Sequence, residues 1–140
     1  MTQEKKELLL RDLSARLPYG VKVLCLRDFN HTWYTLEMID IGDNEVYLTT
    51  NESYANRYVE IEDVKPYLFP LSSMTEEQKR EYNRWKHEIP VCHYEYGDVV
   101  EEIELLDSPE SFEYLIENHF DYRGLIPMDL AIDATGLNVY

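Results

Sequence analysis

The chain has 140 residues, of which 28 are Asp or Glu and 13 are Lys or Arg, so its formal net charge is −15 at pH 7. Most of this charge lies in residues 87–140, which contain 13 acidic residues and a single base, Arg123. This half is not expected to bind nucleic acid or an anionic membrane directly, because both require positive charge on the protein. No run of about 18 apolar residues occurs, so no membrane span is expected.

The first predicted element is an amphipathic helix from Thr2 to about Leu17. Thr2 can act as the N-cap, and Pro18–Gly20 contains residues that commonly end a helix. Leucines at helical spacing are expected to face the core; they are Leu9, Leu10, Leu13 and Leu17. Charged residues on the other side are expected to face water; they are Lys5, Lys6, Glu7, Asp12 and Arg16.

Short β-strands are predicted between Gly20 and Leu71, because β-branched and aromatic residues dominate there and apolar positions alternate. The strand segments are residues 20–28, 31–41, 44–50 and 57–69. Polar breaks separate them, at Asp28–His31, at Ile41–Glu45 and in a loop that begins at Thr50. We expect a small antiparallel sheet, or a partly closed barrel similar to an SH3 domain in which Pro66 marks the exit.

A second helix is predicted from Thr75 to about Glu88. Thr75 and Gln78 have the spacing of a capping box, in which each side chain binds the backbone amide of the other residue. The apolar stripe of this helix is thin, so we expect Tyr82 and Trp85 to provide most of its packing.

The next part of the chain lies between this helix and the third one. Val91–Tyr96 is predicted as a strand and Gly97–Asp98 as a turn, while Val99–Leu106 fits either a strand or an irregular segment. A third helix is predicted to begin at Ser108 and to end between Asn118 and Tyr122. A short helical turn at Met128–Ile132 and a tail from Ala134 complete the chain.

Together these elements predict an α+β fold: an N-terminal helix, a small antiparallel sheet or SH3-like partly closed barrel, and two further helices. The first part is residues 1–71. The second, acidic part is residues 72–140, which we expect to pack on the same core.

Four segments of the chain together are similar to one known family. They are ARLPYGV (15–21), VKPYLFP (64–70), SSMTEEQ (72–78) and NHFDYRGLI (118–126). They resemble small uncharacterised proteins from gut Bacteroidales genomes and their phages. The resemblance implies a cytoplasmic setting and a mobile-element origin, and it implies no activity.

The last of these segments is expected to pack rather than to catalyse. Phe120 and Leu125 are predicted to fold back on the core after a helix C-terminus. Arg123 is expected to pair with a carboxylate such as Asp121 or Glu117. A binding role for Phe120, Tyr122 and Arg123 is the alternative.

Three neighbouring residues, His87, Cys92 and His93, are candidate zinc ligands. Zinc requires four ligands at orderly spacing, and residues 92 and 93 point to opposite faces of a strand. The alternative is a buried Cys92 beside a surface His93. Since the N-terminus lacks the apolar block of a signal peptide, Cys25 and Cys92 are expected to be free thiols in the cytoplasm.

No motif for catalysis is present, because the sequence lacks a nucleophile elbow, a P-loop and a dinucleotide-binding glycine motif. We therefore expect a non-enzymatic protein without a cofactor. An alternative of a different class is a small hydrolase or a metal-binding protein.

The residues from His87 to Asp121 include eleven acids and no Lys or Arg. Hydrated carboxylates that improve solubility explain this charge simply. A surface that mimics nucleic acid and binds a basic DNA- or RNA-binding protein through Glu101, Glu102 and Glu104 is the alternative. The function expected from the sequence is a cytoplasmic binding or accessory protein of mobile-element origin, whose protein partner is unidentified.

Overall fold

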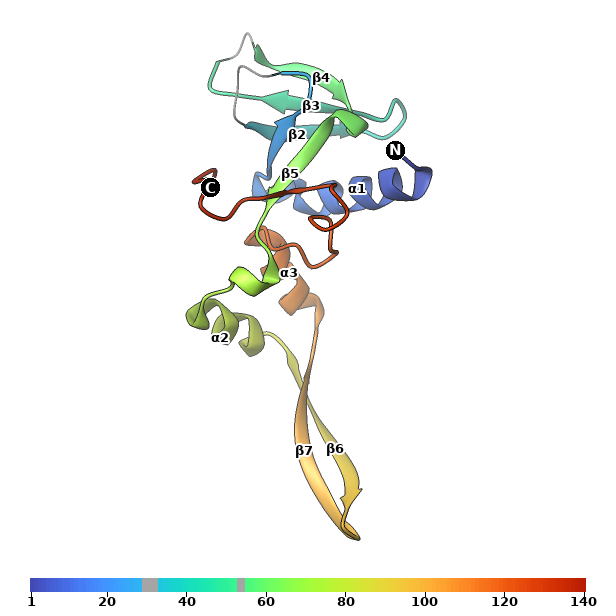
Figure 1. The fold of residues 1–140 in the computed structure, drawn as a ribbon, viewed down its shortest axis with the longest axis vertical. Helices are drawn as coiled ribbons and strands as arrows, with labels where there is room; N and C mark the ends of the chain where they lie inside the picture. Colours follow the sequence, from blue (N-terminus) through green and yellow to red (C-terminus); the bar gives the residue numbers. More distant parts are fainter. Residues whose placement is uncertain (29–32, 53–54) are drawn as a thin grey trace. The chain divides into compact units, whose positions relative to one another are not determined.

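The computed structural model describes residues 1–28, 33–52 and 55–140 (Figure 1). Parts of the predicted connector at Asp28–His31 and of the predicted loop after Thr50 therefore lie outside the described residues. The described chain has the predicted α+β fold. It divides into two compact units, which are Met1–Ser73 with His119–Tyr140 and Met74–Asn118.

Helix α1 (Gln3–Arg16) confirms the predicted N-terminal helix. The Thr2 hydroxyl accepts a hydrogen bond from the Lys5 amide at 3.2 Å, which satisfies one of the free donors at the helix start. Leu9 and Leu13 are fully buried in one core with the strands of the sheet.

The first unit contains a six-stranded sheet in the order β4-β3-β2-β1-β5-β8 (Figure 1). Its strands are β1 (Lys22–Cys25), β2 (Tyr34–Asp40), β3 (Glu45–Thr49), β4 (Arg57–Glu60), β5 (Val64–Leu68) and β8 (Ile132–Asp133). Short 3₁₀ turns lie at Leu17–Tyr19, Ile61–Asp63 and Leu71–Ser73.

The sheet is mixed and open. The pairs from β4 to β5 are antiparallel, as predicted, whereas β5 and β8 are parallel. Strands β4 and β8 lie at opposite ends of the order, so the described strands do not close into the SH3-like barrel that was the alternative. The predicted turn at Ile41–Glu45 is confirmed, and Asn44 takes the left-handed conformation (φ 54°) that asparagine tolerates.

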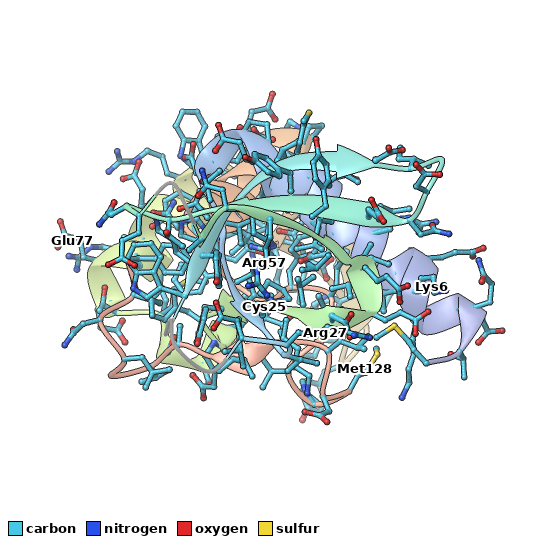
Figure 2. The ribbon with its side chains drawn as sticks, turned by 90° about the horizontal axis from the view of Figure 1, so that it is seen from above. Lys6, Cys25, Arg27, Arg57, Glu77 and Met128 are labelled. Carbon is cyan, nitrogen blue, oxygen red and sulfur yellow. The ribbon has the colours of Figure 1, made fainter. Side chains whose placement is uncertain are left out.

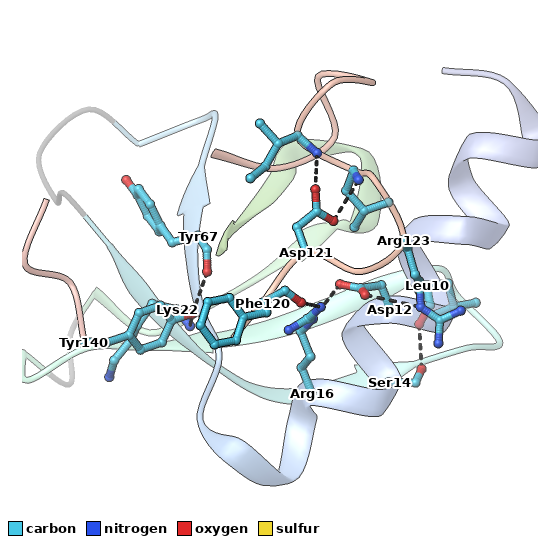
Figure 3. A network of polar contacts seen from close by, with 12 residues as sticks. Leu10, Asp12, Ser14, Arg16, Lys22, Tyr67, Phe120, Asp121, Arg123 and Tyr140 are labelled. Atoms are coloured by element: carbon cyan, nitrogen blue, oxygen red, sulfur yellow. Dashed lines mark hydrogen bonds and ion pairs between the residues drawn. The ribbon is translucent and has the colours of Figure 1, made fainter. Parts of the chain in front are cut away.

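Asp12 and Arg16 do not face water, contrary to the prediction, because both side chains are fully buried. They neutralise each other across one helical turn, with Arg16 Nε 2.9 Å from Asp12 Oδ2. Arg16 Nη2 also donates to the Phe120 carbonyl at 2.6 Å (Figure 3). A buried charge needs both a counter-ion and hydrogen bonds, and this arrangement supplies them.

Residues 119–140 return to the first unit, where they pack beside β5. The Phe69 amide donates to the His119 carbonyl at 2.8 Å, and the Asp121 amide donates to the Phe69 carbonyl at 2.8 Å. Further along, Ile132–Asp133 forms β8, so the predicted helical turn at Met128–Ile132 is wrong. Parallel pairing with the distant β5 satisfies the backbone there instead.

The segment after Ala134 is not a free tail. The Tyr140 hydroxyl accepts a hydrogen bond from the Lys22 amide at 2.9 Å and donates to the Tyr67 carbonyl at 2.8 Å (Figure 3). The Tyr140 ring stacks on His119 with centroids 3.7 Å apart. Burial raises the pKa of the Tyr140 hydroxyl, and it keeps this donor protonated.

The second unit consists of α2 (Glu76–Arg84), β6 (His87–Glu95), β7 (Asp98–Leu106) and α3 (Pro109–Glu117). The predicted capping box at Thr75 is confirmed, and Ser108 caps α3 in the same manner. Helix α2 ends at Arg84 rather than near Glu88, because β6 begins three residues later and pairs with β7. No helix among the described residues has the length and apolar character needed to cross a membrane.

The buried ion pair gives a first prediction. Asp12→Ala leaves Arg16 buried without its counter-ion, so the free energy of unfolding should fall by about 3–5 kcal/mol. Arg11→Ala, at an exposed position of the same helix, should change it by no more than about 0.5 kcal/mol. Urea unfolding followed by circular dichroism measures both; equal losses would contradict the assigned role of the pair.

His119 gives a second prediction. Burial, and then the charges of Arg16 and Lys22, lower the pKa of its imidazole from 6.5 to about 4. Between these values the unfolded chain binds more protons than the folded protein, so stability should fall as the pH is lowered through this range. His119→Gln should therefore weaken the loss of stability between about pH 7 and pH 5.

His87→Gln is the matched control, because His87 is exposed in β6. Urea unfolding at each pH measures the slope, and an NMR titration of the His119 ring measures its pKa directly. A ring that titrates at the ordinary value would overturn the prediction.

Candidate functional site

Strands β6 and β7 form a long two-stranded hairpin that extends away from α2 and α3 within the second unit (Figure 1). Nine residue pairs are in register, from His87 opposite Leu106 to Glu95 opposite Asp98. At about 3.3 Å per residue each strand is about 30 Å long. Most contacts of each strand are made with the other strand.

The hairpin turn explains why the register is regular. Tyr96 and Gly97 have φ values of 52° and 84°, and two successive residues with positive φ are typical of a two-residue type I′ turn. The turn therefore lies one residue before the predicted Gly97–Asp98. Val99–Leu106 is a strand, which resolves the alternative that the sequence left open.

The register gives the hairpin two faces. One, here called the apolar face, contains Glu88, Pro90, Cys92, Tyr94, Val99, Glu101, Ile103 and Leu105. The other, here called the acidic face, contains His87, Ile89, Val91, His93, Glu95, Asp98, Val100, Glu102, Glu104 and Leu106. On the apolar face Tyr94, Val99 and Ile103 are 82%, 60% and 67% exposed, so large apolar side chains lie open to solvent.

The three predicted interaction glutamates are all exposed, but they do not share a face. Glu102 and Glu104 lie on the acidic face, whereas Glu101 lies on the apolar face opposite Cys92. Because side chains alternate along a strand, a flat partner surface contacts either Glu101 or the other two.

The three candidate metal ligands do not converge. His87 and His93 share the acidic face but stand six residues apart, about 20 Å along the strand. Cys92 points to the other face and is exposed, so the prediction of a buried Cys92 is wrong; β6 and β7 form a separate two-stranded sheet in the described chain. Among the residues that the structure describes, no group of three His, Cys, Asp or Glu side chains is placed to hold a metal ion.

Phe120, Tyr122 and Arg123 belong to the packing of the first unit. Phe120 is 2% exposed, and its carbonyl accepts the hydrogen bond from Arg16. Arg123 Nε lies 3.3 Å from Asp12 Oδ1, so its partner is Asp12 rather than the predicted Asp121 or Glu117.

The Asp121 carboxylate holds a turn of the backbone. It accepts hydrogen bonds from the Leu125 and Ile126 amides at 2.8 and 2.9 Å (Figure 3). These bonds hold the turn that carries Leu125 into the core, where it is fully buried, as predicted.

A cleft of about 340 Å³ lies where the hairpin joins α3, and sequence reasoning did not find it. It is here called the base cleft, and its lining residues are Trp85, Pro109, Glu110, Glu113, Tyr114 and Glu117. The glutamates recur at helical spacing on α3, so this pattern was visible in the sequence. The place of Trp85 beside that helix was not, because it depends on contacts between distant residues.

The floor of the base cleft is held in place by its neighbours. The Tyr114 ring stacks on Tyr82, with centroids 6.3 Å apart and planes inclined by 8°. The Tyr82 hydroxyl in turn donates to an Asp107 carboxylate oxygen, and the Ser108 hydroxyl donates to the Trp85 carbonyl at 2.5 Å. Burial, and then the charges of nearby glutamates, raise the pKa of Tyr114, so its hydroxyl stays neutral in an acidic setting.

A second cleft, of about 410 Å³, runs along β4 in the first unit. Its lining includes Arg27 and Arg57, both labelled in Figure 2, together with three acidic residues, Glu45, Glu60 and Asp63. Arg27 Nε pairs with Asp63 Oδ2 at 2.7 Å. Since the opposing charges are mixed and one arginine is already paired, this cleft favours no class of charged ligand.

Comparison with protein-family models, with curated proteins and with solved structures finds no match to this chain. The candidate site is therefore defined by geometry alone. It consists of the two faces of the hairpin and of the base cleft, all within Met74–Asn118.

The hairpin turn gives a third prediction. Gly97→Ala places a side chain at φ 84°, which should cost about 1–2 kcal/mol and open the β6–β7 pairing more often. Hydrogen exchange should become faster for the amides of β6 and β7 and stay unchanged in the first unit.

Gly42→Ala is the control, because Gly42 does not have a positive φ and an added Cβ meets Asp40 at 3.4 Å, an ordinary contact. Equal exchange in the two variants would contradict the type I′ turn.

Proposed function

We propose that this protein is a non-enzymatic binding protein and that the β6–β7 hairpin contacts a basic protein partner. The observation that carries the proposal is the combination of exposed apolar side chains with carboxylates on one hairpin. Residues 87–106 contain six Asp or Glu and no Lys or Arg. The cytoplasmic setting and the mobile-element origin belong to the same proposal and rest on the resemblance of the four segments described above.

The apolar face supplies the affinity in this proposal. Fully burying a side chain such as Ile103 gains about 1.5–3 kcal/mol, and several such side chains are exposed together. A lone two-stranded hairpin is only marginally stable in water. A partner that covers the apolar face therefore also stabilises the hairpin.

The carboxylates determine which partner fits. Six negative charges attract a surface rich in Lys and Arg and increase its rate of association at low salt. The same charges repel a second copy of this hairpin, so pairing of two identical hairpins is disfavoured. A basic protein is therefore the partner that this surface favours.

A nucleic-acid mimic is the second candidate, and the acidic face favours it. Glu95, Asp98, Glu102 and Glu104 lie on this face, and the last two are about 7 Å apart, the repeat of alternate residues in a strand. In that case the partner is a DNA- or RNA-binding protein, and nucleic acid competes with the hairpin for it.

Capture from a nuclease-treated host lysate tests the proposal and is the fourth prediction. Tyr94→Ser with Ile103→Ser removes exposed apolar surface, and it should reduce recovery of the wild-type partner at least tenfold at every salt concentration. Glu102→Gln with Glu104→Gln should weaken capture mainly at low salt, because salt screens exposed charges.

Met38→Ser with Ile41→Ser is the matched control, since these side chains are 50% and 67% exposed in the first unit. The proposal fails if the hairpin variants retain the partner as well as this control does. Release of the partner by added duplex DNA, with no effect of the Tyr94 and Ile103 changes, would favour the nucleic-acid mimic.

A further inference from the structure

We propose that the base cleft is a guanidinium-binding site that takes an arginine side chain of the partner. This inference rests on the proposed function, because it places an anchor for the same basic partner at the foot of the hairpin. The site combines an apolar floor of Trp85, Tyr114 and Pro109 with three carboxylates, from Glu110, Glu113 and Glu117.

In the described part of the chain, the carboxylates of the base cleft have no cation of their own. Among the described residues, no ion pair reaches Glu110, Glu113 or Glu117. Nearby cations of the second unit make other contacts. Arg84 pairs with Glu81 at 3.0 Å, and the Lys86 ammonium lies over the Tyr82 ring at 4.3 Å from its centroid. Three glutamates that form no ion pair with a described cation therefore belong to the lining of the cleft.

The aromatic floor determines the kind of cation. Trp85 is 46% exposed and lines the cleft, whereas Tyr114 is nearly buried and stacks on Tyr82. Cations bind over aromatic faces, and tryptophan is the strongest such partner. A floor that is already ordered loses little conformational entropy when the ligand binds.

Arginine fits this combination better than lysine does. Its guanidinium is planar, weakly hydrated and able to stack on a ring, and its fork of donors matches a carboxylate in a bidentate manner. A lysine ammonium is compact and strongly hydrated, so it loses more hydration when it enters an apolar cleft.

The position of the cleft links it to the hairpin. Trp85 lies two residues before β6, and Pro109 begins α3, three residues after the end of β7. The bond from the Ser108 hydroxyl to the Trp85 carbonyl joins these two chain segments at the foot of the hairpin. A partner segment lying along the hairpin can therefore place one arginine in the cleft while its other basic residues meet the hairpin carboxylates.

Peptide binding tests this inference and is the fifth prediction. The chain has two tryptophans, so Trp33→Phe leaves Trp85 as the only one and makes its fluorescence a reporter of the cleft. The probe is a seven-residue peptide of alternating glycine and arginine. Matched peptides contain lysine, or the neutral isostere citrulline, in place of arginine. We expect saturable quenching with the arginine peptide, at least fivefold weaker binding of the lysine peptide and no binding of the citrulline peptide.

Variants separate the cleft from general charge attraction. Glu113→Gln with Glu117→Gln should weaken binding of the arginine peptide at least tenfold. Glu4→Gln with Glu37→Gln removes the same charge from the first unit and should weaken it less than twofold. All four positions are exposed, so the folds should be unchanged, which circular dichroism checks. Equal losses in the two variants would overturn the site and leave only non-specific attraction.

Other outcomes identify other occupants. Equal affinity for the lysine and arginine peptides would overturn the choice of a guanidinium. Quenching by free spermidine at the concentration that the arginine peptide requires would overturn the proposal of a partner arginine, because the cleft would then bind a small free amine.

The two proposals can fail separately. If the cleft variants lose the peptide while the hairpin variants keep the captured partner, the arginine site stands and the hairpin proposal fails. If the hairpin variants lose the partner and the cleft variants bind the peptide normally, the arginine site fails alone.

Discussion

The buried charge of Arg16 is the constraint on which the first unit depends. A guanidinium with no exposed surface must find a counter-ion and acceptors inside the protein. Asp12 supplies the counter-ion one turn away on the same helix, but the Phe120 carbonyl comes from residues more than a hundred positions later in the chain. The core therefore cannot form fully until the C-terminal segment has returned, so helix α1 and residues 119–125 stabilise each other.

That return defines the second unit as an insertion between β5 and β8. The chain departs after Phe69 and comes back at Phe120, and these two residues form a β-bridge with each other. Since the departure and return points are adjacent, Met74–Asn118 can fold between them without disturbing the order of the strands. The hairpin of this insertion is a separate two-stranded sheet, and its strands do not pair with the six strands of the first unit.

Local signals predicted the local elements well. Thr2 and Thr75 mark helix starts because a cap involves residues only three positions apart, and the alternation of apolar residues marked β1 to β4 because it reflects burial of one face. It did not mark β5, where Pro66 was expected to end the sheet but pairs with Val23 inside it. Features that depend on distant residues were not predictable in this way. Arg16 follows the polar pattern of an exposed helix face, and only its meeting with Phe120 makes burial possible. The parallel pairing of Ile132 with β5 and the place of Trp85 beside α3 also depend on contacts between residues far apart in the chain, so local patterns did not predict them. The hairpin was only partly predictable, since Glu101 and Glu102 interrupt the alternation that would identify β7.

That interruption bears on function. Glutamate is depleted in strands and contributes little to a hairpin that has no other support, yet β7 carries Glu101, Glu102 and Glu104 in four positions. Charge needed only for solubility could equally lie on loops and helices, where it costs less. Here it occurs beside Val99 and Ile103, whose exposure lowers solubility rather than raising it. Carboxylates and exposed apolar side chains on the same two strands have opposite effects on solubility, and a basic partner with apolar residues of its own would use both. This composition supports the proposal that the hairpin binds a partner over the proposal that its charge serves solubility alone.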